Sequence, residues 1–298
     1  MRTNRSVGTI SFHVLNYFFL SLFAFICVYP FYYIFIYTIS SPEDAGRGIA
    51  LLPVHLTLSN YNLILSNDGI ISAFIISASR TLVGTVITLF FCTIFAFVMT
   101  HKETLFRTFM YRVTIASLYV SAGLIPWFLV MRAYELNNNF LLYVLPSAMS
   151  GYFVLLIKVY IEQLPASLEE SAVIDGAGYF TVFLKIIIPL SMPILAAVGV
   201  FAAVNQWNSF FDNLILVENP KLQTLQYLLY RVLDQSEALA RQYQRGETST
   251  LSAAGQAIIT PTAVKMTITM VATIPVLLIY PFLQRYFVKG ILLGAVKG

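Results

Sequence analysis

The chain has 298 residues, of which 58% are hydrophobic and only 11% are charged. A water-soluble domain carries roughly a quarter of its residues as Asp, Glu, Lys and Arg, so this composition excludes a soluble protein, a disordered chain and a free nucleic-acid binder. The formal charge of +4 is small, and in a membrane protein surplus Lys and Arg gather in cytoplasmic loops. The two cysteines, Cys27 and Cys92, lie in apolar runs, which favours packing over redox or metal chemistry.

Long apolar runs predict an all-α membrane protein that forms a single domain over residues 1–298. A bilayer core about 30 Å thick needs about 20 apolar residues in a helix, and the runs that meet this length cover residues 14–39, 71–100, 109–130, 140–161, 185–216 and 264–287. The first run is longer than a signal-peptide core and lacks a small-residue cleavage site, which favours an uncleaved span. Segments 40–70 and 212–262 are then long loops on one side of the membrane.

The distribution of Lys and Arg predicts that both termini are cytoplasmic. Cations near span ends are more frequent on the cytoplasmic side, and with the N-terminus inside the larger group is cytoplasmic: Arg2, Arg5, Lys102, Arg107, Arg112, Lys158, Lys185, Arg285, Lys289 and Lys297. The smaller group is then outside: Arg47, Arg132, Lys221, Arg231, Arg241 and Arg245. Arg80 and Lys265 lie near the outer ends of spans, where such side chains can snorkel outward; a substrate or lumen role is the alternative.

The two outer segments are too long to be simple turns. Segment 40–70 predicts a loop with a short interfacial piece. Segment 212–262 contains apolar residues at helical spacing, which predict an amphipathic helix: Leu222, Leu225, Leu228, Leu229, Val232 and Leu233. It is either an interfacial helix followed by a linker or a docking surface for an extracellular partner.

The loop over residues 162–180 departs from the charge rule. Between Lys158 and Lys185 it carries four anions, Glu162, Glu169, Glu170 and Asp175, so the stretch has a formal charge of −2 where positive charge is expected. Ser167 and Glu170 have the spacing of a capping box, Glu169 and Glu170 suit the positive end of a helix, and Gly176 suits its end. We therefore expect a helix of about eight residues.

A helix of this length is not stable alone, so it must pack on something. Small residues at Ser171, Ala172, Gly176 and Ala177 allow close approach of another backbone. The sequence thus allows two interpretations: an ordinary solvated loop, or an acidic docking helix for a cationic socket on a partner protein.

Here the residues resemble a known family. The run Glu170-Ser-Ala-Val-Ile-Asp-Gly176, followed by nine residues and then Ile186-Ile-Ile-Pro189, is similar to the EAA signature of ABC importer permeases, in the form typical of carbohydrate uptake. Ser171 and Ile188 depart from the pattern by residues of similar size. The stretches Gln206-Trp-Asn208 with Leu225-Gln-Tyr-Leu228, and Tyr280–Gly290 with Gly294–Gly298, resemble the same subfamily, so the likeness covers most of the chain.

The resemblance implies the permease fold and a multi-pass subunit of a bacterial cell membrane that imports sugars, with oligosaccharides favoured. It implies that the loop helix is a coupling helix for a separate ATPase, with contact residues Glu169, Glu170, Ser171, Ala172, Asp175, Gly176 and Ala177. Pairing of Glu170 with the ATPase competes with its capping role. The implied partners are a second permease subunit, two ATPase subunits that bind ATP and Mg²⁺, and an extracellular sugar-binding protein. The chain itself has no Gly-x4-Gly-Lys-Ser/Thr phosphate-binding loop.

A sugar route through a membrane needs aromatic faces and hydrogen-bonding groups, because buried hydroxyls without partners are costly. Polar residues inside spans face the bundle interior, so the candidates for this route are Asn205, Gln206, Trp207, Asn208, Tyr119 and Trp127. The alternative for the first four is hydrogen bonding between helices, and for Trp127 a place in the interfacial aromatic belt.

Two other classes of protein fit the sequence less well than an ABC sugar permease. A secondary transporter should carry acidic residues within its spans for ion coupling, and here they occur only at span ends. A membrane enzyme has little support, since no metal motif occurs and His13, His55 and His101 are scattered. An ABC permease for a solute other than sugar also fits the motifs.

Overall fold

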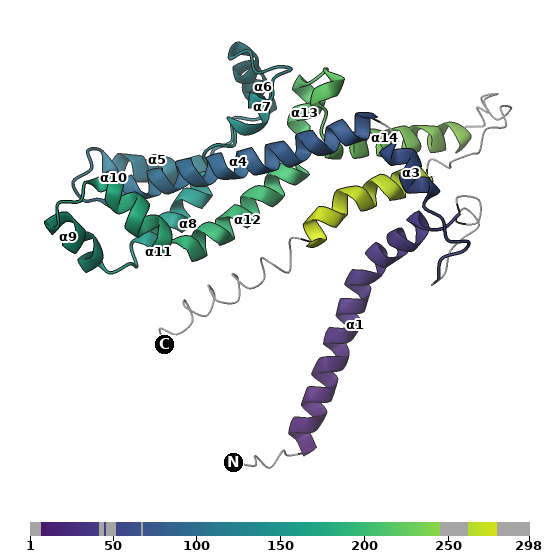
Figure 1. Cartoon of the computed structure of the whole chain (residues 1–298), viewed down its shortest axis with the longest axis horizontal. Coiled ribbons are helices and arrows are strands. Elements are labelled where there is room, and N and C mark those ends of the chain that lie inside the picture. The colour runs from purple at the N-terminus through teal and green to yellow at the C-terminus, as the bar shows by residue number, and fades with distance from the viewer. Residues whose placement is uncertain (1–6, 42–44, 46–51, 67, 245–261, 279–298) are drawn as a thin grey trace. The chain divides into compact units, whose positions relative to one another are not determined.

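The computed structural model describes residues 7–41, 45, 52–66, 68–244 and 262–278, and the contacts given below are those among these residues (Figure 1). The chain divides into two compact units. The first comprises Met1–Asn67 with Arg231–Ile274, and the second comprises Asp68–Tyr230 with Pro275–Gly298. The described part is mostly helical and contains no strand, with one isolated bridge between Ser40 and Leu56.

The first unit begins with α1 (Val7–Thr38), a long apolar helix with almost no buried side chains along its span. A small apolar cluster at its end contains Ile36, Tyr37, Ala45 and Ala263. The segment that follows contains α3 (Ser59–Leu65), where the Asn60 amide donates to the carbonyls of residues 38 and 40 at 3.0 and 3.1 Å. The short helix is compatible with the predicted loop, and its expected place at the membrane interface stays a prediction. The bare flank of α1 needs lipid or a partner protein to cover it.

The second unit is built around α4 (Asp68–Thr100), which packs along α12 (Met192–Asn208) and α8 (Gly151–Ile161) (Figure 1). Their shared core is apolar and contains Cys92, Ala96, Val154, Ile157 and Val198 among its most buried members. Burial of Cys92 agrees with a packing role, whereas Cys27 on α1 is exposed. Helix α5 (Arg107–Tyr119) adds to α8 and α4.

Two predicted spans are not continuous helices. Span 109–130 is divided into α5 and α6 (Leu124–Ala133), because Gly123 adopts a φ of +78° and the ring of Pro126 would clash with the carbonyl four residues earlier. Span 140–161 is divided into α7 (Leu141–Val144) and α8 at Pro146. The prediction of unbroken helices at these two places was wrong, because it counted apolar residues and gave too little weight to Gly and Pro.

The fifth predicted span, 185–216, is bent. Helices α10 (Tyr179–Val182), η1 (Phe183–Ile187, a π-helix) and α11 (Ile188–Leu190) form one arm, and the angle to α12 at Ser191 is 79°. Pro189 and Pro193 flank the bend, and each lacks the N–H that continues a helix. The span then stops at residue 208, and α13 (Phe211–Leu216) follows a break at Ser209 and Phe210.

Within the described residues, two helices are long and apolar enough to cross a bilayer, Ser11–Thr38 and Gly69–Thr100. The bent pair Tyr179–Leu190 and Met192–Asn208 makes a third if it counts as one span. The remaining apolar helices, Leu124–Ala133, Gly151–Ile161 and Thr262–Leu278, are shorter. The part of the sixth predicted span beyond residue 278 lies outside the described residues.

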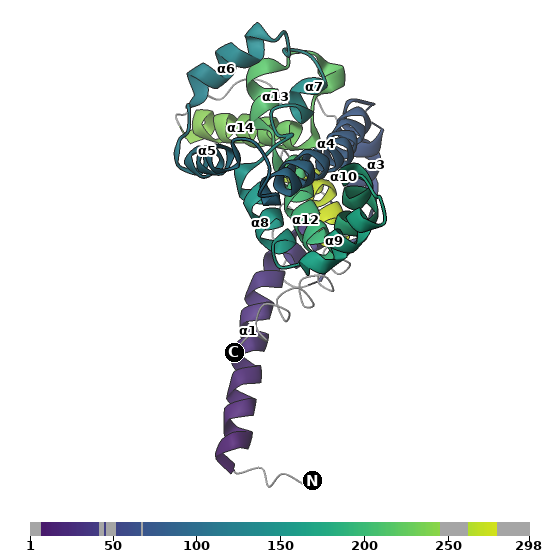
Figure 2. The ribbon, with the colours of Figure 1, turned by 90° about the vertical axis from the view of Figure 1, so that its left-hand side faces the viewer.

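The short elements of the second unit gather at two ends. Helix α9 (Ala166–Ile174) lies beside α10, whereas α6, α7 and α13 lie away from it on the opposite side of the bundle, as two views at right angles agree (Figures 1 and 2). A 3₁₀ turn, η2 (Pro220–Leu222), then leads to α14 (Leu225–Gln244). The structure thus confirms the amphipathic helix that the leucine spacing predicted.

Candidate coupling helix and membrane cavity

Helix α9 occupies the acidic loop, as the sequence predicted, but it starts differently. Its N-cap is Pro165, and no side chain caps it. The predicted capping box of Ser167 and Glu170 is therefore wrong: both residues lie within the helix, since Pro at the preceding position already fixes the backbone that enters it. Glu170 is thus free of the capping role that competed with pairing to a partner.

The C-terminal end of α9 is a Schellman motif. Gly176 adopts a φ of +83°, its N–H donates to the Val173 carbonyl at 3.0 Å, and the Ala177 N–H donates to the Ala172 carbonyl at 2.9 Å. Gly is favoured here because a left-handed backbone is strained for residues with a Cβ. Gly176 thus ends the helix, as predicted from the sequence.

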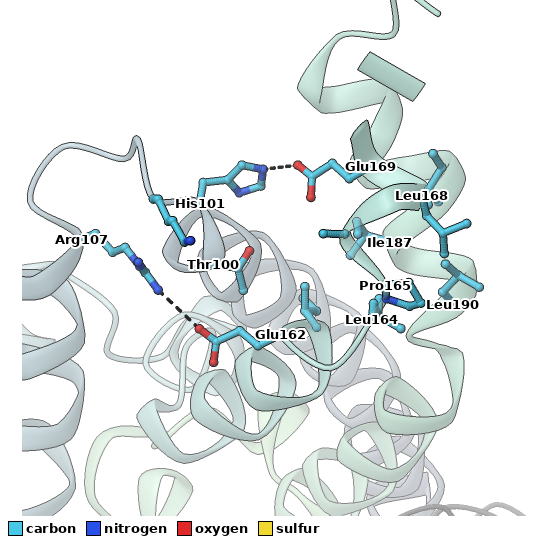
Figure 3. A pocket seen from close by; sticks show the side chains of 14 residues that line it. Thr100, His101, Arg107, Glu162, Leu164, Pro165, Leu168, Glu169, Ile187 and Leu190 are labelled. Atoms are coloured by element: carbon cyan, nitrogen blue, oxygen red, sulfur yellow. Dashed lines mark hydrogen bonds and ion pairs between the residues drawn. The ribbon is translucent and has the colours of Figure 1, made fainter. Parts of the chain in front are cut away.

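Glu169 on α9 contacts His101, the residue that directly follows α4. His101 Nε2 lies 2.5 Å from Glu169 Oε1, while His101 Nδ1 lies 2.9 Å from the Phe97 carbonyl oxygen (Figure 3). The His101 ring also meets the edges of Phe97 and Tyr179. The long central helix is therefore tied directly to α9 through one side chain, a contact that the sequence did not reveal because 68 residues separate the two.

The four acids of the loop fall into two groups. Glu162 accepts from Lys158 Nζ at 2.6 Å and Arg107 Nη2 at 3.5 Å, and Glu169 contacts His101. Glu170 and Asp175 are exposed and make no ion pair among the described residues. Two negative charges of the loop thus remain available to a partner.

The small residues predicted as contact positions also fall into two groups, half-buried and exposed. Ala172 and Ala177 are half-buried against this chain's own core, whereas Ser171 and Gly176 are exposed. Ile174, which the sequence did not single out, is 85% exposed on α9. The outer surface of α9 therefore combines free carboxylates with an uncovered apolar side chain.

A cavity of about 380 Å³ opens beside the start of α9 (Figure 3). Its wall is formed by the ends of α4 and α8, the start of α9, and the helices η1 and α11. The lining residues include Thr100, Lys102, Arg107, Glu162, Leu168 and Ile187. Both charged and apolar side chains line this hollow between the start of α9 and the bundle.

A second cavity, of about 280 Å³, lies in the bundle beside a buried Arg. Arg80 on α4 donates to both carboxylate oxygens of Asp212, at 2.5 and 3.1 Å, to Gln206 Oε1 at 3.1 Å, and to the Ser209 carbonyl at 3.1 Å. Its guanidinium carbon lies 4.5 Å from the centre of the Tyr143 ring. The sequence-based expectation that Arg80 snorkels outward is wrong, because Asp212 compensates its charge inside the protein.

The hydrogen bonds continue from Arg80 across the bundle. Gln206 Nε2 donates to Ser147 Oγ at 2.5 Å, and the Ser147 carbonyl accepts from Thr88 Oγ1 at 2.8 Å. Ser147 lies in the break between α7 and α8, and Ser209 lies in the break between α12 and α13. The α7–α8 and α12–α13 breaks are therefore joined to α4 by one polar network that borders the cavity.

The structure brings three of the six predicted pathway residues to this cavity: Asn205, Gln206 and Trp127. Trp207 is buried instead and meets the edge of the Phe74 ring. Asn208 is exposed, with its side-chain oxygen 3.4 Å from the Gln226 amide nitrogen, and Tyr119 is exposed at the end of α5.

A substrate or lumen role for Arg80 was only the alternative prediction, and Asp212, Tyr143 and Ser147 were not predicted as site residues. A signal existed for the first two, since a cation inside one apolar run and an anion at the end of another are expected to pair within a membrane protein. Tyr143 and Ser147 carried no such signal, because only folding brings the α7–α8 break to α4. Among the described residues, no group of three or more His, Cys, Asp or Glu side chains could hold a metal ion.

The bent helices, the acidic loop helix and the polar cavity together describe a membrane transport subunit. The chain belongs to the family of binding-protein-dependent transport system inner membrane components, whose model matches residues 69–293. It is therefore an ABC transporter permease of the bacterial inner membrane, a multi-pass transport subunit and not an enzyme. Family membership excludes the secondary-transporter alternative.

Several known transport proteins are similar to this chain over nearly its whole length. The chain is 32% identical to the polygalacturonan/rhamnogalacturonan transport system permease YtcP of Bacillus subtilis, over 96% of this chain and 98% of the relative. It is 27% identical to the arabinooligosaccharide permease AraQ of Halalkalibacterium halodurans, over 92% and 93%. A crystal structure of a bacterial ABC transporter involved in import of the acidic polysaccharide alginate matches with a TM-score of 0.82 and 27% identity, covering 95% of this chain and 98% of the other. The permease fold is thus shared along nearly the whole chain.

Proposed function

We propose that this chain forms half of the translocation pathway of an ATP-driven importer for oligosaccharides. Its relatives named for saccharide transport include permeases for polygalacturonan/rhamnogalacturonan and for arabinooligosaccharides, together with a transporter for alginate. The carrying observation in this chain is α9, a short helix with a well-formed end and a surface left charged and apolar by its own fold. The alternative is a permease for a solute other than sugar. Uptake of labelled oligosaccharide by the complete importer would exclude it.

Coupling to the ATPase runs through α9. Glu169 contacts His101, and Glu162 contacts Lys158 and Arg107. Of the two carboxylates left without an ion pair among the described residues, Glu170 and Asp175, Glu170 lies within the helix and is the one that meets a cation of the ATPase. Ile174 beside it supplies the apolar surface that such a docking site needs. Movement of the ATPase then reaches α4 through the contact of Glu169 with His101.

The complete importer contains further chains. We place six spans in this subunit, with both termini and α9 in the cytoplasm, and pair it with a second permease, two ATPase subunits and an extracellular sugar-binding protein. ATP and Mg²⁺ bind to the ATPase subunits. Helices α1 and α4 support the membrane-spanning part of this arrangement, because both are long and apolar enough to cross a bilayer.

Charge reversal at α9 tests the coupling. The permease is co-expressed with its ATPase, and recovery of the ATPase and uptake of oligosaccharide are measured for wild type, Glu170→Gln and Glu170→Arg. We expect partial loss for the first and near-complete loss for the second, because a buried like-charge contact replaces an ion pair. Glu218→Arg, an exposed charge reversal elsewhere in the chain, is the matched control. Unchanged recovery and uptake for Glu170→Arg would contradict the assignment.

A further inference from the structure

The cavity beside Arg80 has the composition of a ligand site. Its wall combines the rings of Trp127 and Tyr143 with the polar groups of Ser147, Asn205 and Arg80. Small-molecule sites are apolar hollows with a few placed polar groups. Asn205 is exposed there, and its amide makes no hydrogen bond among the described residues. The hollow and the Asn205 amide at its wall thus offer space and a hydrogen-bonding group to a ligand.

The cavity lies near the outer end of the membrane-spanning part. Arg80 precedes Thr100 by about 20 residues of continuous helix, which at 1.5 Å per residue is roughly 30 Å, the thickness of the hydrocarbon core. With α9 on the cytoplasmic side, as proposed above, Arg80 therefore stands where a solute arriving from outside enters the bundle.

Arg80 is more deeply buried than its partner Asp212. The Arg80 side chain is 3% exposed and that of Asp212 is 12% exposed. Arg80 projects from the middle of a 33-residue helix, whereas Asp212 lies on the six-residue α13, directly after the break at Ser209 and Phe210. Because its neighbours Asn213 and Leu216 are buried, a turn of the Asp212 side chain, rather than a rotation of α13, would move the carboxylate away and leave the guanidinium facing the cavity without its anion.

A buried guanidinium requires an anion, because an unpaired charge in this environment is strongly unfavourable. Planar, bidentate pairing of the kind seen with Asp212 fits any carboxylate. A carboxylate that enters the cavity can replace Asp212 without a change in the net charge of the site. A neutral sugar cannot do so, since its hydroxyls leave the charge of Arg80 uncompensated when Asp212 departs.

We propose that this cavity binds an acidic sugar unit, with the uronate carboxylate taking the place of Asp212 on Arg80 while a sugar face packs on Trp127. Asp212 keeps the site neutral when no substrate is present. The inference rests on the proposed import of oligosaccharides and names their class as uronate-containing. Asn205 supplies a hydrogen bond to a sugar hydroxyl.

Binding of charged and neutral trisaccharides tests the exchange. The purified full importer is titrated with trigalacturonate and, separately, with the uncharged galactotriose of the same linkage, for wild type, Asp212→Asn and Arg80→Gln. We expect Asp212→Asn to strengthen trigalacturonate binding roughly tenfold, because the competing carboxylate is gone, and Arg80→Gln to weaken it by at least about tenfold. Galactotriose binding should change little in either variant. Arg132→Gln, which removes an exposed cation, is the matched control.

Several outcomes decide against the proposal. Equal binding of the two trisaccharides, weaker trigalacturonate binding in Asp212→Asn, or no binding of trigalacturonate to wild type and Asp212→Asn would each overturn it. If Arg80→Gln does not assemble, the double variant Arg80→Gln with Asp212→Asn removes both charges together and replaces it. Uptake of neutral oligosaccharides without preference for acidic ones would contradict this inference alone. Absence of any oligosaccharide uptake would contradict the proposed function.

Discussion

The side chain of Gln206 stands at the centre of the polar network, and a glycine makes room for it. A Cβ built on Gly84 would lie 2.7 Å from the Gln206 Cδ atom, closer than real contacts allow. Gln206 could not move aside without losing its bonds to Arg80 and Ser147. The absence of a side chain at Gly84 is thus a condition for the buried network.

Gly84→Ala should destabilise the protein by displacing Gln206. The expected loss is about 1–3 kcal/mol, the range for leaving a buried polar group unsatisfied, measured as a lower unfolding midpoint of the purified complex. Gly199→Ala is the control, since its new Cβ would meet only the methyl groups of Leu89, at 3.2 Å. Adding Gln206→Ala to Gly84→Ala should abolish the clash, so an equal effect of Gly84→Ala with and without Gln206 would contradict this account.

At the scale of elements, α9 depends on its ends more than on its own length. Nine residues form too short a helix to be stable alone. It is held by the contact of Glu169 with His101, by Ala172 and Ala177 against the core, and by the left-handed turn at Gly176. A coupling element must transmit force, so a defined end should matter for its function.

Gly176→Ala should impair coupling, because a left-handed backbone costs about 1–2 kcal/mol for a residue with a Cβ. We expect reduced oligosaccharide uptake per ATP hydrolysed in reconstituted vesicles. Gly178→Ala, two residues away, is a close control: its φ is −71°, and a new Cβ meets no atom within 4 Å. Equal effects of the two substitutions would show that the turn conformation is not the cause.

For the whole molecule, the orientation in the membrane is predicted from charge, while the number of spans depends on how the broken helices are counted. Helices α5 and α6, and α7 and α8, each replace one predicted continuous span. Non-helical backbone at membrane depth is tolerated where it is buried in protein or lines a cavity. The α7–α8 break borders the cavity beside Arg80, so the interruptions are compatible with six passes.

Cysteine labelling tests this orientation. In a variant that lacks Cys27 and Cys92, we expect Lys221→Cys to react with a membrane-impermeant maleimide in intact cells, and Ser167→Cys to react only after permeabilisation. Fluorescence of a green fluorescent protein fused to the C-terminus reports a cytoplasmic end. Labelling of Ser167→Cys in intact cells, or a fusion protein without fluorescence, would show that the topology is wrong.

Much of the molecule was readable from local pattern. The helical class, α1, α4, the loop helix α9 and the amphipathic α14 follow from runs and spacings within short stretches of chain. The breaks at Gly123 and Pro146 were also encoded locally, but apolar content alone does not reveal them. The start of α9 was misjudged because the spacing of Ser167 and Glu170 suggested a side-chain cap, whereas the helix begins after Pro165 without one.

The sequence by itself determined that this protein lies in a membrane and to which family its motifs belong, because hydropathy and motif spacing are properties of consecutive residues. The side that its acidic loop faces stays a prediction from the charge rule. Only the tertiary structure decided which polar groups meet. Arg80 and Asp212 are 132 residues apart, and His101 and Glu169 are 68 apart. Such pairs form because burial makes an unpaired charge costly, and no local pattern specifies which partner a distant part of the chain will bring.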